Sequence, residues 1–237
     1  MKLSRAFSPG QMVAVAVYSC LVLSAPARAE IAAAHVSELN GTAFATAGDG
    51  ATRKVQVNDR LFERERIITG KKTAMELTFT DGTKLTLGES TIIRVDSYKY
   101  SKKDLSSDGE GFSTSILQGV VRAFTGLLAK RRPLSVKFTT KVATIGIRGT
   151  HFAAEVEGDS ATIILLAQQD TSAANAIEVS NTYGRVEIDK AGWGTEIPDA
   201  RSPPSPPRKM RSTQSMNRIL RSVQTTRRVR VPRAPIR

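Results

Sequence analysis

Apolar and polar residues alternate along most of the chain between Val36 and Ile197, and turn residues interrupt the alternation at short intervals. A period of two places successive side chains on opposite faces of a strand, so this pattern is typical of short, half-buried β-strands. No segment of this body shows the apolar stripe of an amphipathic helix. The pattern predicts an all-β fold: an antiparallel β-sandwich or β-roll of about a dozen short strands.

Three turns are expected to join neighbouring strands into hairpins. The clearest is Asp81-Gly82, which separates the alternating runs Met75–Phe79 and Leu85–Leu87. Asp-Gly favours the positive φ angles of a type I′ turn, whose twist matches that of paired antiparallel strands. Similar signals predict hairpins at Asn40-Gly41 and at Glu157–Ser160. Further strands are expected at Thr52–Val57, Ile67–Thr69, Ile92–Tyr100, Phe112–Leu117, Val121–Phe124, Val136–Phe138, Ala143–Ile147, Ile177–Ser180, Arg185–Ile188 and Gly194–Ile197.

The first 29 residues have the features of an export signal. Lys2 and Arg5 precede an apolar run from Met12 to Leu23, and Ala27–Ala29 is a small-x-small cleavage site. The run is shorter than the roughly 20 residues of a transmembrane helix. We therefore expect a signal peptide, a periplasmic or secreted mature chain, and no transmembrane segment in that chain. Cys20, the one cysteine, lies within the signal, so no disulfide is expected.

The formal net charge of +13 is spread unevenly. Of the 35 basic residues, three precede residue 30 and eleven follow residue 200, which leaves 21 in the body beside all 22 acidic residues. The body is therefore almost neutral, and the basic character belongs to an appendage. We expect three parts: a signal peptide at 1–29, a β domain at 30–200, and a Pro-rich spacer with a basic tail at 201–237.

Several motifs resemble the FecR domain family. Thr69-Gly70, the strand Ala74–Phe79 and the turn Asp81–Thr83 follow the family's order of T-G, A-x-L-x-F and D-G-[ST]. Downstream, Ile116–Val121 resembles its L-x-G-x-[VAF] strand, and Val142–Phe152 resembles its T-x-x-A-x-[IV]-[GR]-[VI]-R-G-T-x-F segment. The resemblance covers about 36–188, essentially the whole body.

The resemblance implies a non-catalytic binding and relay module. The family's namesake regulators join such a domain to a membrane helix and a cytoplasmic anti-sigma segment. The export signal expected here stands in their place, which implies a stand-alone exported module with an envelope protein partner in signalling or assembly. Within the last motif, Arg148, Gly149 and Thr150 are the candidate binding residues, since a guanidinium can bind a carboxylate or a partner's backbone. The alternative is that Arg148 pairs with a neighbouring acid and is structural.

No set of residues indicates catalysis or a cofactor. The only histidines are His35 and His151, and no His/Asp/Glu cluster has metal-ligand spacing. His151 alternates with expected core positions and should face solvent. Glu155 and Glu157 share a strand face, where paired carboxylates are usually solvated. We expect no enzymatic activity, no metal and no cofactor.

The tail is predicted to contact anionic surfaces such as lipopolysaccharide, acidic headgroups or polyanionic polymers. Ser202–Pro207 favours a stiff polyproline spacer. Beyond it, Met216, Ile219, Leu220 and Val223 are spaced as in a short amphipathic helix that orders on a partner. The candidate contacts are Arg208, Lys209, Arg211, Arg218, Arg221, Arg227, Arg228 and Arg230. Nucleic acid is not expected, because an exported protein seldom meets it and the tail has no aromatic residue to stack on bases.

Two further interpretations stay open. The chain could be a structural envelope protein whose basic tail binds an anionic polymer while the body only displays it. Alternatively, the tail is solvated and has no specific partner.

Overall fold

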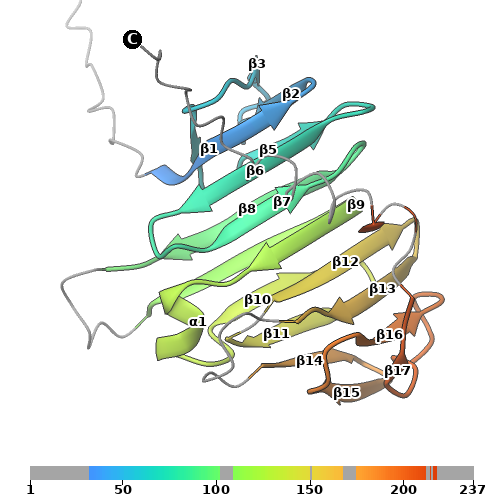
Figure 1. Ribbon diagram of the computed structural model, residues 1–237. Helices are drawn as coiled ribbons and strands as arrows, with labels where there is room; N and C mark the ends of the chain where they lie inside the picture. The colour runs from blue at the N-terminus through green and yellow to red at the C-terminus, as the bar shows by residue number, and fades with distance from the viewer. Residues whose placement is uncertain are drawn as a thin grey trace, which may run out of the picture. The chain divides into compact units, whose positions relative to one another are not determined.

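The chain folds into 17 short strands and a helix of five residues, α1 (Leu127–Arg131), within its described part (Figure 1). The computed structural model describes residues 32–101, 109–149, 151–167, 175–211, 214 and 216–217, all within the unit Ile31–Arg237. The all-β fold class is thereby confirmed. The predicted signal peptide lies outside the described residues.

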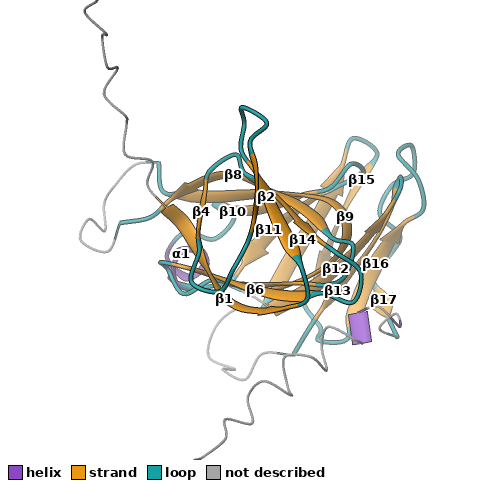
Figure 2. Ribbon diagram, turned by 90° about the horizontal axis from the view of Figure 1, so that it is seen from above, coloured by secondary structure: helices purple, strands orange, loops and turns teal. Residues whose placement is uncertain are grey.

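The strands form two sheets. In spatial order, sheet A contains β4 (Arg60–Phe62), β1 (Ala32–Asn40), β6 (Ala74–Phe79), β7 (Lys84–Leu87), β9 (Gly111–Phe124), β12 (His151–Glu157), β13 (Ser160–Leu165), β16 (Trp193–Ile197) and β17 (Arg208–Lys209). Sheet B contains β3 (Thr52–Lys54), β2 (Ala43–Thr46), β5 (Arg66–Thr69), β8 (Ile92–Lys99), β9 again, β10 (Val136–Thr139), β11 (Thr144–Arg148), β14 (Ala176–Asn181) and β15 (Gly184–Ile188). Figure 2 shows the two layers, with β8 and β10 in one and β1 and β6 in the other. Strands β9 and β10 pair in parallel, whereas the other pairings are antiparallel.

Strand β9 belongs to both sheets. Its first half pairs with β8 and β10 in sheet B, and its second half pairs with β7 and β12 in sheet A. The two halves meet at Gly119, whose φ of 89° lies in the left-handed region that favours glycine. The sequence pattern predicts separate strands at 112–117 and 121–124, and the structure joins them into one bent strand. The bend at Gly119 therefore connects the two layers.

The hairpin predicted at Asn40-Gly41 is wrong. Strand β1 pairs with β4 and β6 in sheet A, whereas β2 pairs with β3 and β5 in sheet B. Gly41 has a φ of 105°, and a Cβ at this position would collide with the side chain of Thr73. Gly41 therefore has the positive φ angle that the sequence predicts, but at this position the chain passes from one layer to the other and does not form a hairpin.

The other two hairpins are confirmed. Strand β6 pairs with β7, and β12 pairs with β13 with Glu157 opposite Ser160. In the first hairpin Gly82 has a φ of 86°, but Asp81 is not in the left-handed region, so the predicted type I′ geometry is wrong. Asp81 makes side-chain hydrogen bonds that set this turn, as shown below.

A chain of aromatic rings fills the space between the sheets. Phe79 and Phe152 come from sheet A, and Tyr98, Phe112 and Phe138 come from sheet B. Ring centroids lie 4.6 Å apart for Phe79 and Phe112, 5.6 Å for Phe112 and Phe138, and 5.0 Å for Phe138 and Phe152. Tilted and edge-on ring pairs at such distances stabilise a core beyond the area they bury. The rings thus connect strands that are distant in sequence.

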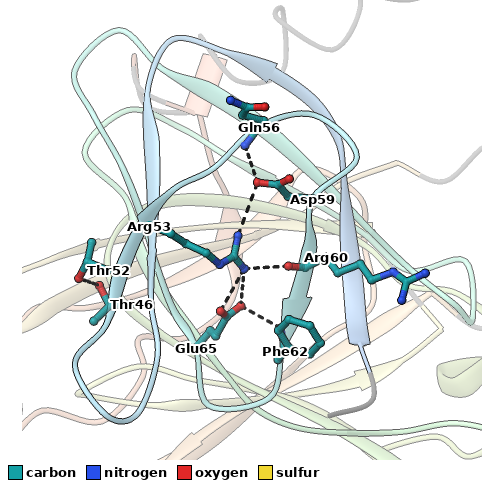
Figure 3. Close-up of polar contacts among 8 residues, drawn as sticks. All are labelled: Thr46, Thr52, Arg53, Gln56, Asp59, Arg60, Phe62 and Glu65. Carbon is teal, nitrogen blue, oxygen red and sulfur yellow. Dashed lines mark hydrogen bonds and ion pairs between the residues drawn. The ribbon is translucent and has the colours of Figure 1, made fainter. Parts of the chain in front are cut away.

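An ion pair between the partly exposed Arg53 and the buried Glu65 stabilises the connection from β3 to β4 at the edge of the sheets (Figure 3). The Glu65 side chain, on a residue only 5% exposed, accepts hydrogen bonds from Arg53 Nη2 at 3.0 and 3.1 Å and from the Phe62 amide at 2.9 Å. Arg53 also donates to the Arg60 carbonyl at 2.8 Å and lies 3.5 Å from Asp59. Because the buried carboxylate is fully engaged, its desolvation is offset by charge-assisted hydrogen bonds.

The Pro-rich segment lies along the β domain. Ser205 donates through its amide to the Glu196 carbonyl at 3.0 Å, and its own carbonyl accepts from Thr195 Oγ1 at 2.7 Å. The Asn181 side chain donates to the Ser202 carbonyl at 2.8 Å. Strand β17 then pairs with β16. The segment therefore contacts the domain along its length, and the boundary near residue 200 stays a prediction.

Candidate functional site

A cleft of about 870 Å³ lies where several turns meet at one end of sheet A. Its lining includes Ala74, Gly88 and Val120, which are neighbours across the strands because Met75 pairs with Leu87 and the Gly88 amide donates to the Val120 carbonyl at 2.9 Å. The volume falls within the roughly 300–1,000 Å³ of pockets that bind small ligands.

The cleft carries more negative than positive charge. Glu89, Glu155 and Glu157 supply three carboxylates, and Lys72 supplies one ammonium group. The Lys72 amide donates to Glu89 Oε2 at 2.9 Å, which holds two of the turns together. The lining therefore favours a cationic group over an anionic one.

Glu155 is the unusual member of this lining. The residue is 9% exposed, and its carboxylate makes no hydrogen bond or ion pair with any residue in the described ranges. The carboxylate oxygens are not among the fully buried polar atoms that lack a partner, so they open into the cleft. Glu155 is therefore largely covered but still reaches solvent through the cleft, and Glu157 at the hairpin is exposed. The alternating pattern correctly places Glu155 and Glu157 on one strand face. It does not show that turns from distant strands surround Glu155 and leave Glu157 exposed.

A second polar group lies on the outer face of sheet A. Arg122 Nε donates to His151 Nε2 at 2.6 Å, so the neutral imidazole carries its proton on Nδ1 and donates it to the Ala167 carbonyl at 2.9 Å. The prediction that His151 faces solvent is wrong, since it is 8% exposed. Burial lowers the pKa of His151, and the positive charge of Arg122 lowers this pKa further. The hydrogen bond to the Ala167 carbonyl acts in the opposite direction and raises it. The pKa of Arg122 is also lowered by burial, although Glu76 opposes this.

His151 should make the protein less stable in mild acid. Its pKa in the folded state lies below the ordinary 6.5, so the unfolded chain binds the proton first as the pH falls. The effect is absent above about pH 6.5 and grows as the pH falls from there toward the lowered pKa. We expect urea unfolding to show a smaller loss of stability between pH 7 and 5 for His151→Gln than for the native chain. An equal loss of stability between pH 7 and 5 for His151→Gln and for the native chain would contradict this role for His151.

Of the predicted binding residues, Arg148 is the last residue of β11 on sheet B. Arg148 Nη1 is 3.3 Å from Glu187 Oε1 on the edge strand β15, and both side chains are largely exposed. Such a pair contributes about 0–1 kcal/mol, so it leaves the guanidinium accessible to a partner. Gly149 has a φ of 64°. Thr150 lies outside the described residues, and a binding role for the three residues stays a prediction.

The Asp81–Thr83 motif has a structural role. The Asp81 side chain, on a residue 2% exposed, accepts hydrogen bonds from the Thr83 amide at 3.0 Å, from Thr83 Oγ1 at 2.8 Å and from the Leu128 amide at 3.3 Å. Thr83 Oγ1 in turn accepts from the Gly126 amide at 2.9 Å. The motif therefore fixes the start of α1 against the β6–β7 turn, which explains these residues without a ligand.

The candidate tail residues divide between the described and undescribed parts of the chain. Arg208 lies 2.5 Å from Glu196, while Lys209 and Arg211 are exposed. The remaining candidates, which lie outside the described residues, are Arg218, Arg221, Arg227, Arg228 and Arg230. Met216, the first residue of the predicted amphipathic stripe, is 1% exposed and packs against Val120, Ala153 and Ile164 on sheet A.

The described ranges lack both a cluster of candidate metal ligands and a helix that could span a membrane. They contain no group of three or more His, Cys, Asp or Glu side chains that could hold a metal ion. No helix there has the length and apolar character needed to cross a membrane.

Comparison with known proteins gives one family match. Residues 65–169 match the family described as FecR protein. A solved cell surface anchoring domain is 25% identical over 27% of this chain and 84% of that domain, with a TM-score of 0.26. Two structures of a protein described as an anti-sigma factor from Parabacteroides distasonis are 12% identical over 67% of this chain, with a TM-score of 0.44, and the match spans 64% of that protein. No curated protein matches the chain.

Proposed function

We propose that this chain is an exported, non-catalytic binding module that receives a protein partner in envelope signalling or assembly, because residues 65–169 match the family described as FecR protein. The family match confirms the resemblance carried by the motifs from Thr69-Gly70 to Val142–Phe152, and it is the observation on which the proposal rests. Export follows from the signal features of residues 1–29. The partner belongs to the cell envelope.

The cleft of sheet A is the surface that best suits recognition. It is lined by Glu155, a largely covered residue whose carboxylate the described residues leave without a partner. By contrast, Arg148 is already paired with Glu187 on an exposed surface. A partner that inserts a basic side chain into the cleft would supply the missing counter-charge.

The basic tail adds a second binding property. Residues 201–237 contain eleven cations and no acid, so they are attracted to anionic headgroups and polymers. The exposed Lys209 and Arg211 favour the second candidate function, a structural envelope protein that acts through its tail alone. The two candidates differ in which part of the chain recognises a protein.

A capture experiment with two baits separates these functions. One bait is the chain ending at Asn217, and the other is a peptide of residues 218–237, each exposed to solubilised envelopes of the native host. The binding module predicts that the first bait retains a distinct protein that the peptide does not. Capture of the same material by the peptide alone would instead establish the structural, tail-based function.

A further inference from the structure

The C-terminal end of the described chain lies beside the cleft. Met216 packs against Val120, Ala153 and Ile164, and Met210 and Leu166 complete this cluster on the outer face of sheet A. Val120 also lines the cleft, where it is the cross-strand partner of Glu155. Since each residue spans up to about 3.5 Å, the residues that follow Asn217 need only a few positions to reach the cleft.

The segment that follows has the charge that the cleft lacks. Residues 218–237 contain seven arginines and no acidic residue. The lining of the cleft contains three carboxylates, of which Glu89 already accepts a hydrogen bond from the Lys72 amide, and the single ammonium group of Lys72. Glu155 and Glu157 are the carboxylates to which the tail is expected to bind. A guanidinium presents a planar fork of donors that matches a carboxylate, so arginine is the side chain best suited to Glu155.

We propose that the cleft is a binding site for an arginine-rich segment and that residues 218–237 of the same chain occupy it. The buried Met216 tethers this segment next to its site, which raises its effective concentration to about the millimolar range. Individually weak ion pairs then suffice to hold it. The occupied cleft is closed to other basic segments until a competing partner or an anionic surface draws the tail away. This contact requires no signalling role, because both components belong to one chain.

Binding of the tail as a separate peptide tests the proposal. The chain ending at Asn217 keeps Met216, every described strand and both hydrophobic clusters, so its fold can be compared with that of the full chain by circular dichroism. A fluorescently labelled peptide of residues 218–237 should bind the shortened chain in an anisotropy titration. The full chain should bind it at least tenfold more weakly, because its own tail competes at the higher effective concentration.

Matched variants of the shortened chain locate the site. Glu155→Gln removes the charge but keeps the shape, and it should weaken peptide binding roughly tenfold, as expected for one charge-assisted hydrogen bond. Glu187→Gln neutralises an exposed carboxylate on β15 of sheet B and should leave binding unchanged.

Three results would overturn the proposal. The first is failure of the folded, shortened chain to bind the peptide. The second is equal binding by the shortened and full chains, and the third is an equal effect of the two substitutions. If light scattering shows a full-chain dimer that dissociates when residues 218–237 are removed, the occupant is the tail of a second copy and the same-chain contact is wrong.

Discussion

Replacement of Gly119 by alanine should be one of the two most destabilising changes considered. A Cβ on Gly119 would collide with the Thr91 side chain and lie 2.6 Å from Thr91 Cα, where the backbone cannot move aside cheaply. The left-handed φ of 89° adds strain, and Thr91 Oγ1 would lose its hydrogen bond from the Val120 amide. We expect a loss of about 3–5 kcal/mol in the free energy of unfolding, measured by urea denaturation, from overpacking and strain together.

Gly82→Ala is the matched control for this change. Gly82 has nearly the same φ, 86°, but no atom lies within 4 Å of a Cβ built there. Its replacement should lower the free energy of unfolding by about 1–2 kcal/mol, which is the strain of the left-handed conformation alone. Equal losses for the two variants would show that the close contact between Gly119 and Thr91 is not what holds the bend of β9.

The second large effect is expected for Asp81→Ala. The substitution leaves the amides of Thr83 and Leu128 and the Thr83 hydroxyl without their acceptor in a site that is 2% exposed. The hydroxyl of Tyr98, 3.2 Å from Asp81 Oδ1, loses the same partner. Because unsatisfied buried groups cost about 1–3 kcal/mol each and some recover water, we expect a total loss of about 3–5 kcal/mol in the free energy of unfolding.

The other confirmed hairpin provides the control for Asp81. Asp159 occupies the β12–β13 turn, and its side chain is 71% exposed, 3.6 Å from Lys141. Asp159→Ala should change the free energy of unfolding by less than about 0.5 kcal/mol, as is usual for surface positions. A small effect at Asp81 as well would mean that the Asp81–Thr83 motif does not anchor α1.

The strands were predictable because alternation is a local property. Met75, Leu77 and Phe79 are buried in the core, as their spacing requires. The sheet to which each strand belongs depends on pairings between distant segments, which the local pattern does not contain. For this reason the sequence pattern predicts a hairpin at Gly41, which the structure does not form, and two separate strands where the structure has the bent strand β9.

The site was less predictable than the fold, for the same reason. Arg148 lies in a recognisable motif, and the structure adds its exposed ion pair with Glu187, which the motif does not indicate. The sequence pattern predicts that His151 faces solvent, because alternation identifies the outer face of a strand but not what covers that face. The cleft combines turns that are far apart in sequence, so no single motif could indicate it.

Hydrogen–deuterium exchange on the full chain and on the chain ending at Asn217 is the most direct test of the central claim that the cleft of sheet A binds an arginine-rich segment. An occupied cleft predicts faster exchange, after removal of residues 218–237, in peptides that cover the turns at 88–90 and 155–158, and unchanged exchange over β14 and β15. Identical exchange at the cleft in the two chains would contradict the claim.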